Sequence, residues 1–162
     1  MVFSIKKFTI YLGVTVFIAG VVAGFLNDRY GTMFDTYNVL RPKLISSGGE
    51  SCLKKLKDKG IKFVKLGNVI DEANDLCIIK TAVEISNFPD TSLSSPVRLN
   101  CNTALSFANW LNDISAKDVA HAGSNVCRKM RSLNIMSEHS FGTAVDIKTI
   151  NGVSVKTDWR KD

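Results

Sequence analysis

An uncharged apolar run near the amino terminus limits what the rest of this chain can fold into. Residues Phe8 to Leu26 carry no charge, and Lys6 and Lys7 stand directly before them. A helix of this length spans about 28 Å, close to the hydrocarbon thickness of a bilayer. A cleaved signal peptide, which is the alternative, has an apolar core of only about 7–15 residues. The run therefore favours a transmembrane anchor at residues 8–26.

The charges beside this run predict its orientation. Two lysines precede the run, and only Arg29 follows it closely. Because positive charges are kept on the cytoplasmic side of a membrane, we expect residues 1–7 to form a cytoplasmic tail. The rest of the chain is then exported.

The remaining length allows one folded domain. The chain has 162 residues, of which 45% are hydrophobic and 22% charged, and these values are typical of a globular protein. Residues 27–50 are polar and turn-rich and end in SSGG followed by Glu50, a composition typical of a tether. We therefore expect a linker over 27–50 and a domain over 51–162.

The cysteines of the chain all lie in this exported part, at Cys52, Cys77, Cys101 and Cys127. They are far apart and form no C-x-x-C pair, so the spacing of a zinc ribbon is absent. Two disulfides that brace a small domain are favoured over reactive thiols, and disulfides persist in oxidising compartments. Four cysteines allow three pairings, and the sequence does not choose among them.

Much of the net charge of +6 comes from one lysine-rich segment, CLKKLKDKGIKFVKL. A solvated face of a short helix and strand is the favoured interpretation. An anionic partner such as phospholipid or a cell-wall polymer is the alternative. Nucleic acid is not expected as a partner, because a single aromatic residue, Phe63, lies among these lysines, too few for a surface on which bases stack.

Local patterns predict helices and strands along the domain. A pair of leucines among the lysines favours a short helix that Gly60 closes. Alternating apolar and polar side chains predict strands over 61–66 and 77–85. The segment from Asn87 to Ser95 is expected to be a loop.

Further along, an amphipathic helix and a hairpin are predicted. Asn100 or Asn102 can cap the helix, along which apolar residues recur at helical spacing: Phe107, Trp110, Leu111 and Ile114. Asn151-Gly152 stands between two alternating stretches, the signature of a tight β-hairpin. Together these patterns predict an α+β fold, a small antiparallel sheet with flanking helices on one side.

A short motif that contains a serine, a histidine and an aspartate precedes this hairpin, S-x-H-x-x-G-x-A-x-D. It places His139 in a loop and Asp146 in the strand that follows. An imidazole and a carboxylate are ligands that suit zinc, but spacing alone favours a hydrogen-bonded structural pair. Nothing in the sequence around His121, the only other histidine, suggests a ligand.

The pattern resembles the zinc-binding motif of D-alanyl-D-alanine carboxypeptidases. More of the chain, residues 50 to 159, resembles a narrower group, the bacterial proteins with an extensin-like C-terminal domain. The matching pieces, in the order of that family, are Cys52 with L..KGIKF, Cys77, LNCNTALSFANWL, GSNVCR, SEHSFGTAVDI and NGVSVKTDW. The resemblance implies the fold of D,D-carboxypeptidase and hedgehog-like zinc peptidases, here in an incomplete form.

By this resemblance His139 and Asp146 are zinc ligands. Arg128 is the catalytic cation that polarises a scissile carbonyl or holds a substrate carboxylate, and Ser137 orders the loop that carries the ligands. Family members continue past the DW pair into a histidine-rich segment that supplies the third ligand, whereas this sequence stops at Asp162. We therefore expect zinc as the cofactor of an incomplete site.

Three functions are compatible with the resemblance. The first is an envelope protein, associated with peptidoglycan, that carries a partial zinc-peptidase site. The second is an active zinc metallopeptidase, a carboxypeptidase or endopeptidase, that cuts peptidoglycan stem peptides and takes its third ligand from elsewhere. The third is a truncated, non-catalytic binding or structural protein. In each case we expect a single-pass protein of the cell inner membrane with its domain in the periplasm.

Overall fold

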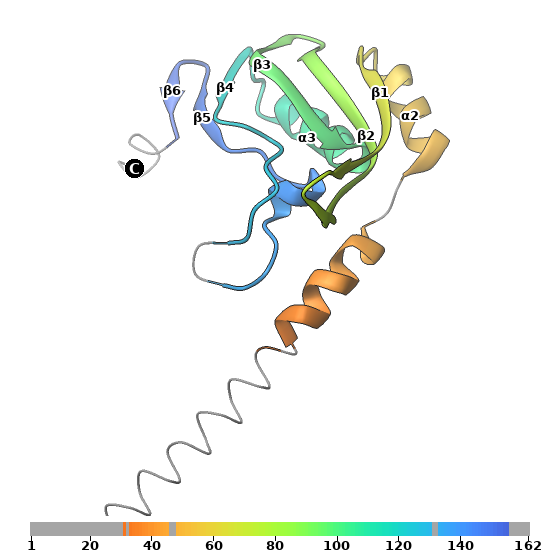
Figure 1. The fold of residues 1–162 in the computed structure, drawn as a ribbon. Helices are drawn as coiled ribbons and strands as arrows, with labels where there is room; N and C mark the ends of the chain where they lie inside the picture. Colours follow the sequence, from red (N-terminus) through yellow and green to blue (C-terminus); the bar gives the residue numbers. More distant parts are fainter. Residues whose placement is uncertain (1–30, 32, 46–47, 131–132, 156–162) are drawn as a thin grey trace, which may run out of the picture. The chain divides into compact units, whose positions relative to one another are not determined.

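The computed structural model describes residues 31, 33–45, 48–130 and 133–155 (Figure 1). The predicted tail at 1–7 and anchor at 8–26 lie outside them. Within the described part of the chain, no helix is long and apolar enough to cross a membrane. Residues 33–44 are helical, although the turn-rich sequence predicts a tether there.

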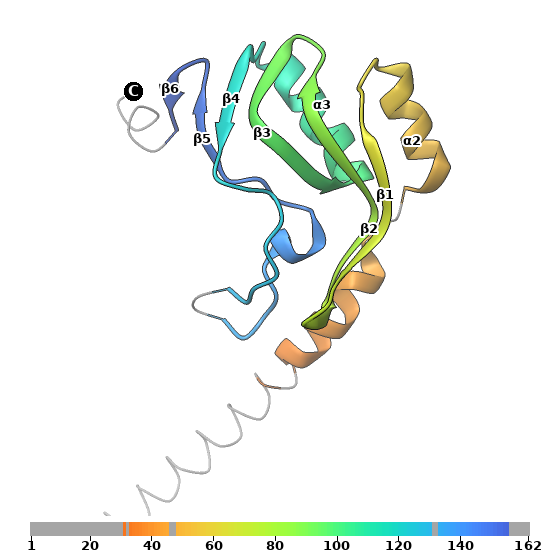
Figure 2. The same cartoon turned by 45° about the horizontal axis from the view of Figure 1, so that its top comes forward.

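In the described residues, six strands form one sheet whose spatial order follows the sequence (Figures 1 and 2). The strands are β1 (Val64–Asp71), β2 (Asn74–Phe88), β3 (Thr91–Asn100), β4 (Asp118–His121), β5 (Ile147–Ile150) and β6 (Val153–Ser154). Neighbouring strands are antiparallel, except that β3 and β4 are parallel. The predicted α+β class with a mostly antiparallel sheet is confirmed.

Two helices, α2 (Gly49–Asp58) and α3 (Cys101–Asp113), contact each other and lie on one face of this sheet (Figure 2). α3 connects β3 to β4, and such a crossover is what lets two strands run parallel. Of the two candidate caps, Asn100 is the one used, because its side-chain oxygen accepts a hydrogen bond from the Asn102 N–H at 3.0 Å. The short helix before Gly60 is confirmed as α2, and Gly60 has φ +71°.

The buried face of α3 differs from the predicted one. Leu111 is buried as expected, but Trp110 and Ile114 are among the exposed hydrophobic residues. Cys101 and Ala104 are buried instead. These small side chains let the helix approach the sheet and α2 closely, so they determine which side of α3 faces the core.

The loop predicted over 87–95 is wrong. β2 and β3 extend almost to each other, and Pro89 and Asp90 form the turn between them. Asp90 has φ +61°, which aspartate tolerates better than most residues. Pro96 fits inside β3 because the β2–β3 pairing has an irregularity around it, where no ladder hydrogen bond is lost.

The remaining strand predictions are confirmed with shifted limits. The strand expected over 61–66 starts only at Val64, and the one expected over 77–85 is the middle of the longer β2. Asn151 and Gly152 form the predicted hairpin between β5 and β6, with φ of +51° and +75°.

Two clusters of buried residues hold the elements together. The larger lies between the helices and the sheet and contains, among others, Leu56, Ile85, Leu99, Leu111 and Val119. The smaller contains Ile45, Cys77, Met136 and Phe141. It joins Ile45 to β2 and to the turn that carries the motif.

The cysteines form two disulfides, and the structure selects one of the three pairings. Cys52–Cys101 joins α2 to α3, and Cys77–Cys127 joins β2 to the segment after β4. Within the described residues no cysteine is free. The first disulfide braces the main core, and the second braces the smaller cluster.

We predict that each disulfide contributes a similar free energy of unfolding. The sequence separations are 49 and 50 residues, so the loss of loop entropy in the unfolded chain is nearly equal, about 4 kcal/mol for each. Urea unfolding of the Cys52→Ser/Cys101→Ser and Cys77→Ser/Cys127→Ser variants measures both losses. Peptide mapping of the unreduced protein checks the pairing, and peptides that link Cys52 to Cys77 or to Cys127 would contradict it.

Candidate functional site

The motif forms a single helical turn that presents His139. Residues Glu138–Phe141 form the 3-10 helix η1, which Gly142 ends in the left-handed conformation. The His139 side chain is only 9% exposed, whereas that of Asp146 is 60% exposed. His139 Nε2 lies 3.2 Å from Asp146 Oδ1. The two predicted ligands are therefore brought together at the edge of a solvent-accessible surface.

Gly142 is required by packing against the sheet. A Cβ atom at this position would lie 2.8 Å from the Asn100 nitrogen and 2.8 Å from Ile79 Cγ2. The Asn100 N–H donates to the Gly142 oxygen at 2.9 Å. The atoms that such a Cβ would meet belong to β2 and to the residue that caps α3.

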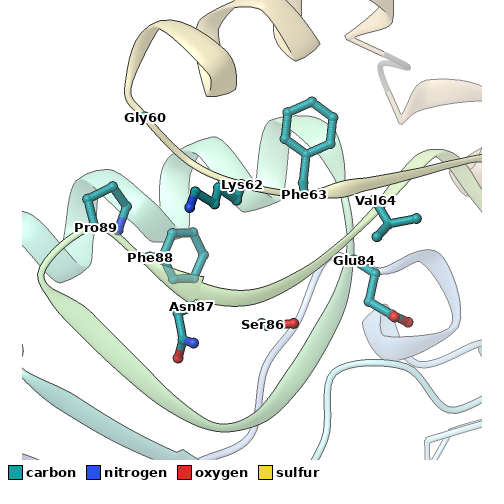
Figure 3. Close-up of a pocket in the computed structure, with 9 residues that line it drawn as sticks. All are labelled: Gly60, Lys62, Phe63, Val64, Glu84, Ser86, Asn87, Phe88 and Pro89. Atoms are coloured by element: carbon teal, nitrogen blue, oxygen red, sulfur yellow. The ribbon is translucent and has the colours of Figure 1, made fainter.

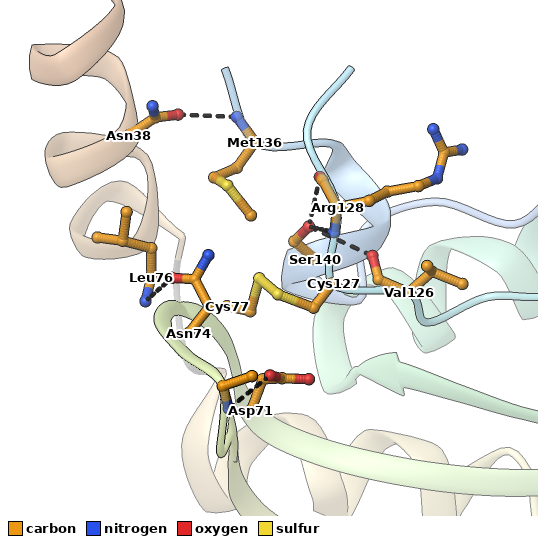
Figure 4. The surroundings of a disulfide bond; sticks show 11 residues. Asn38, Asp71, Asn74, Leu76, Cys77, Val126, Cys127, Arg128, Met136 and Ser140 are labelled. Carbon is orange, nitrogen blue, oxygen red and sulfur yellow. Dashed lines mark hydrogen bonds between the residues drawn. A yellow bond between two sulfur atoms is a disulfide. The ribbon is translucent and has the colours of Figure 1, made fainter. Parts of the chain in front are cut away.

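Arg128 is tied to both sides of the His139 turn. The main-chain oxygen of Arg128 accepts hydrogen bonds from the Ser137 N–H at 2.9 Å and from Ser140 Oγ at 3.1 Å. The main-chain N–H of Arg128 donates to Ser140 Oγ at 3.2 Å. Figure 4 shows its side chain pointing away from the neighbouring Cys77–Cys127 disulfide. The main chain of Arg128 is thus held beside the turn that carries His139.

The predicted role of Ser137 has a structural counterpart in its main chain. Ser137 precedes η1, is buried, and makes no side-chain capping hydrogen bond. Its N–H donates to Arg128, and its oxygen accepts from the Ser140 N–H at 2.9 Å. Ordering of the turn through the Ser137 hydroxyl stays a prediction.

Two helical residues, Asn38 and Arg41, also hold this turn. The sequence did not predict these contacts. The Asn38 amide donates to the Asn134 oxygen at 3.0 Å. Its oxygen accepts from the Met136 N–H at 2.7 Å (Figure 4). Arg41 makes a two-point ion pair with Glu138, at 2.9 and 2.5 Å. The residues next to His139 are therefore held by a segment almost a hundred positions earlier in the chain.

Asp146 is fixed by its main chain to the segment that follows β4. The Ala122 N–H donates to the Asp146 oxygen at 2.7 Å, and the Asp146 N–H donates to the Gly123 oxygen at 3.0 Å. These bonds leave the carboxylate of Asp146 free to turn toward His139. In the described residues, no group of three or more His, Cys, Asp or Glu side chains is placed to share a metal ion.

The lysine-rich segment forms a solvated surface on α2 and the start of β1. Its lysines are exposed, and Lys65 pairs with Glu50 at 2.5 Å. The Lys65 ammonium lowers the pKa of the Glu50 carboxyl below its ordinary value. A cavity of about 550 Å³ lies beside this surface, with the Glu84 carboxylate at the end away from Phe88 and Pro89 (Figure 3). It holds no cluster of metal-ligating side chains.

Comparison with known proteins gives one match. The family model described as "Extensin-like protein C-terminus" matches residues 50–162, more than half of the chain. Neither curated proteins nor solved structures contain a match.

We predict that Gly142→Ala destabilises the domain more than Gly152→Ala. Both glycines have positive φ, but the space around Gly152 is open, so alanine there costs only backbone strain, about 1 kcal/mol. At Gly142 the clash with Asn100 and Ile79 adds to this strain, for a total of about 3 kcal/mol. Urea unfolding of both variants measures the difference. Equal losses of unfolding free energy in the two variants would contradict the close packing of Gly142 against Asn100 and Ile79.

Proposed function

This chain belongs to the extensin-like protein C-terminus family, and from that premise we propose that its domain acts on peptidoglycan stem peptides outside the cytoplasm. In this proposal His139 and Asp146 are zinc ligands and Arg128 is the cation that binds the peptide. Kinship with zinc D,D-peptidases is part of the proposal, and it rests on the S-x-H-x-x-G-x-A-x-D motif.

The observation that carries the proposal is the 3.2 Å between His139 Nε2 and Asp146 Oδ1. Tetrahedral zinc with bonds of about 2.0–2.1 Å places neighbouring ligand atoms roughly 3.3 Å apart. The two side chains therefore stand at the spacing that one zinc ion requires. An ion pair without metal has the same spacing, so zinc itself must be measured.

The residues around this pair support a role in peptide chemistry. Arg128 is exposed. Its main chain makes the hydrogen bonds to Ser137 and Ser140, and its guanidinium remains available for a substrate carbonyl or carboxylate. Zinc held by His139 and Asp146 supplies Lewis acidity. Ser137 and Gly142 keep the turn rigid, which preserves the position of His139.

A third ligand separates a catalytic protein from one that only binds. Catalytic zinc usually has three protein ligands and an open position, and the residues described here place only His139 and Asp146 together. The proposal is catalysis if another segment or partner supplies that ligand. Binding of stem peptides without cleavage is the second candidate, because it needs no third ligand.

The proposed location is the periplasmic face of the inner membrane, with residues 8–26 as the anchor. The two disulfides support an oxidising compartment. The lysines that precede the apolar run support a cytoplasmic amino terminus.

We predict that the purified full chain binds zinc and that His139→Ala weakens binding about 100-fold or more. The reason is that the substitution removes one of two ligands that share the ion. Elemental analysis after equilibration with buffered zinc, with the chain in detergent, measures the effect. His121→Gln is the matched control and keeps its zinc. A folded wild-type chain without zinc, or equal zinc in His139→Ala, would refute the proposed site.

We predict that Arg128→Ala separates the two candidate functions. For a catalytic protein, the zinc-loaded chain shortens stem peptides and the substitution slows this reaction about 100-fold. For a binding protein, the wild type leaves the peptides intact and the substitution weakens their binding about tenfold. Mass spectrometry of the peptides and calorimetric titration give the two readings. No cleavage and no binding by the wild type would exclude both.

A further inference from the structure

Two buried side-chain atoms in the described part of the chain have no hydrogen-bond partner, Arg98 Nε and His121 Nδ1. Buried polar groups are nearly always paired, so each exception calls for a ligand, a water or a strained role. Both residues line the same cavity, which has a volume of about 310 Å³ and is also bordered by Glu84, Ser95 and Asn125. Two residues that each carry an unpartnered buried atom therefore border one cavity.

Contacts with Ser95 favour one tautomer of the His121 ring, whose Nε2 lies 3.2 Å from Ser95 Oγ and close to the Ser95 main-chain oxygen. His121 is 8% exposed, and its Nε2 lies 2.9 Å from the Ser95 oxygen. A carbonyl oxygen only accepts hydrogen bonds, so Nε2 carries the proton of the neutral ring. Nδ1 then presents a lone pair and accepts a hydrogen bond.

Arg98 offers the complementary group. Its main-chain N–H donates to Ser124 Oγ at 2.9 Å, and its Nη2 donates to the Glu84 carboxylate at 3.1 Å. These bonds hold both ends of the residue while Nε–H remains a donor without an acceptor. Glu84 also balances the charge of the guanidinium, so the cavity is close to neutral when His121 is neutral.

One donor, one acceptor and little net charge select the class of ligand. A metal cation at Nδ1 would be repelled by the guanidinium of Arg98. A carboxylate would be repelled by Glu84 and would require a second proton on His121. An amide group meets all the requirements, because its carbonyl accepts from Arg98 and its N–H donates to His121.

We propose that this cavity is a binding site for a peptide amide group, held by Arg98 Nε and His121 Nδ1. The Arg98 side chain is 41% exposed, and release of its hydrogen bond to Glu84 lets it rotate and open the approach to both atoms. The main chain of Ala122 and Gly123, which line the cavity, is hydrogen-bonded to Asp146. The cavity is therefore bordered by the segment that is hydrogen-bonded to the main chain of Asp146. Only the identity of that peptide rests on the proposed function.

The test uses the full chain in detergent with its histidines labelled with ¹⁵N. The sequence has two histidines, so the imidazole signals are assigned with the His121→Gln variant. N-acetylglycylglycine amide, an uncharged peptide, is expected to shift the Nδ1 signal of His121, whereas acetate is not. Arg98→Lys keeps the positive charge but lacks Nε, and it should weaken this binding about tenfold.

Two further variants separate this site from the zinc site. The glutamine in His121→Gln can still donate to Ser95 but lacks the Nδ1 acceptor, so it should lose the peptide and keep its zinc. His139→Ala should lose zinc and keep the peptide.

A shift caused by acetate instead of the peptide would overturn the assignment to an amide. No shift with either probe would mean that a fixed water satisfies the two atoms, and this too would overturn the proposal. Full affinity in both Arg98→Lys and His121→Gln would do the same. Thermal unfolding confirms that each variant is folded before it is titrated.

Discussion

The contacts of Asn100 connect the sheet, a helix and the candidate site, and the rest of the structure depends on them. Its side-chain oxygen caps α3, and its amide donates to the Lys80 oxygen of β2 at 2.7 Å. Its main-chain N–H binds Gly142, which ends the turn that carries His139. The next residue, Cys101, is bonded to Cys52 of α2. One buried residue thus determines where the His139 turn lies relative to the core, and this requires glycine at position 142.

The parts of the fold that short sequence patterns predict are those that depend on near neighbours. Asn151-Gly152 specifies a hairpin because both residues must adopt positive φ, and Asn100 specifies a helix start because its side chain bonds two positions ahead. The loop expected over 87–95 failed for a related reason. The pairing of β2 with β3 supplied hydrogen bonds that override local propensities.

The candidate site was predictable only in part. The motif and the Cys127-Arg128 pair indicate residues that do come together, although their roles stay predictions. No local pattern could reveal that Asn38 and Arg41 bind this turn, because their partners lie 96 to 98 positions later. His121 was passed over for the same reason. Its Nε2 contacts Ser95 of β3, and residue spacing does not encode such a contact between two strands.

The way the site is supported favours a rigid platform at the edge of the sheet. Much of the segment between β4 and β5 has no regular secondary structure, so its ladder hydrogen bonds must be replaced by others. Ser140 binds Val126 and Arg128, Asn38 binds residues 134 and 136, and the Cys77–Cys127 disulfide fixes the strand side. These restraints come from three separate parts of the chain. Irregular backbone held in this way can keep His139 and Asp146 in fixed positions, as the proposed binding of a metal and a peptide would require.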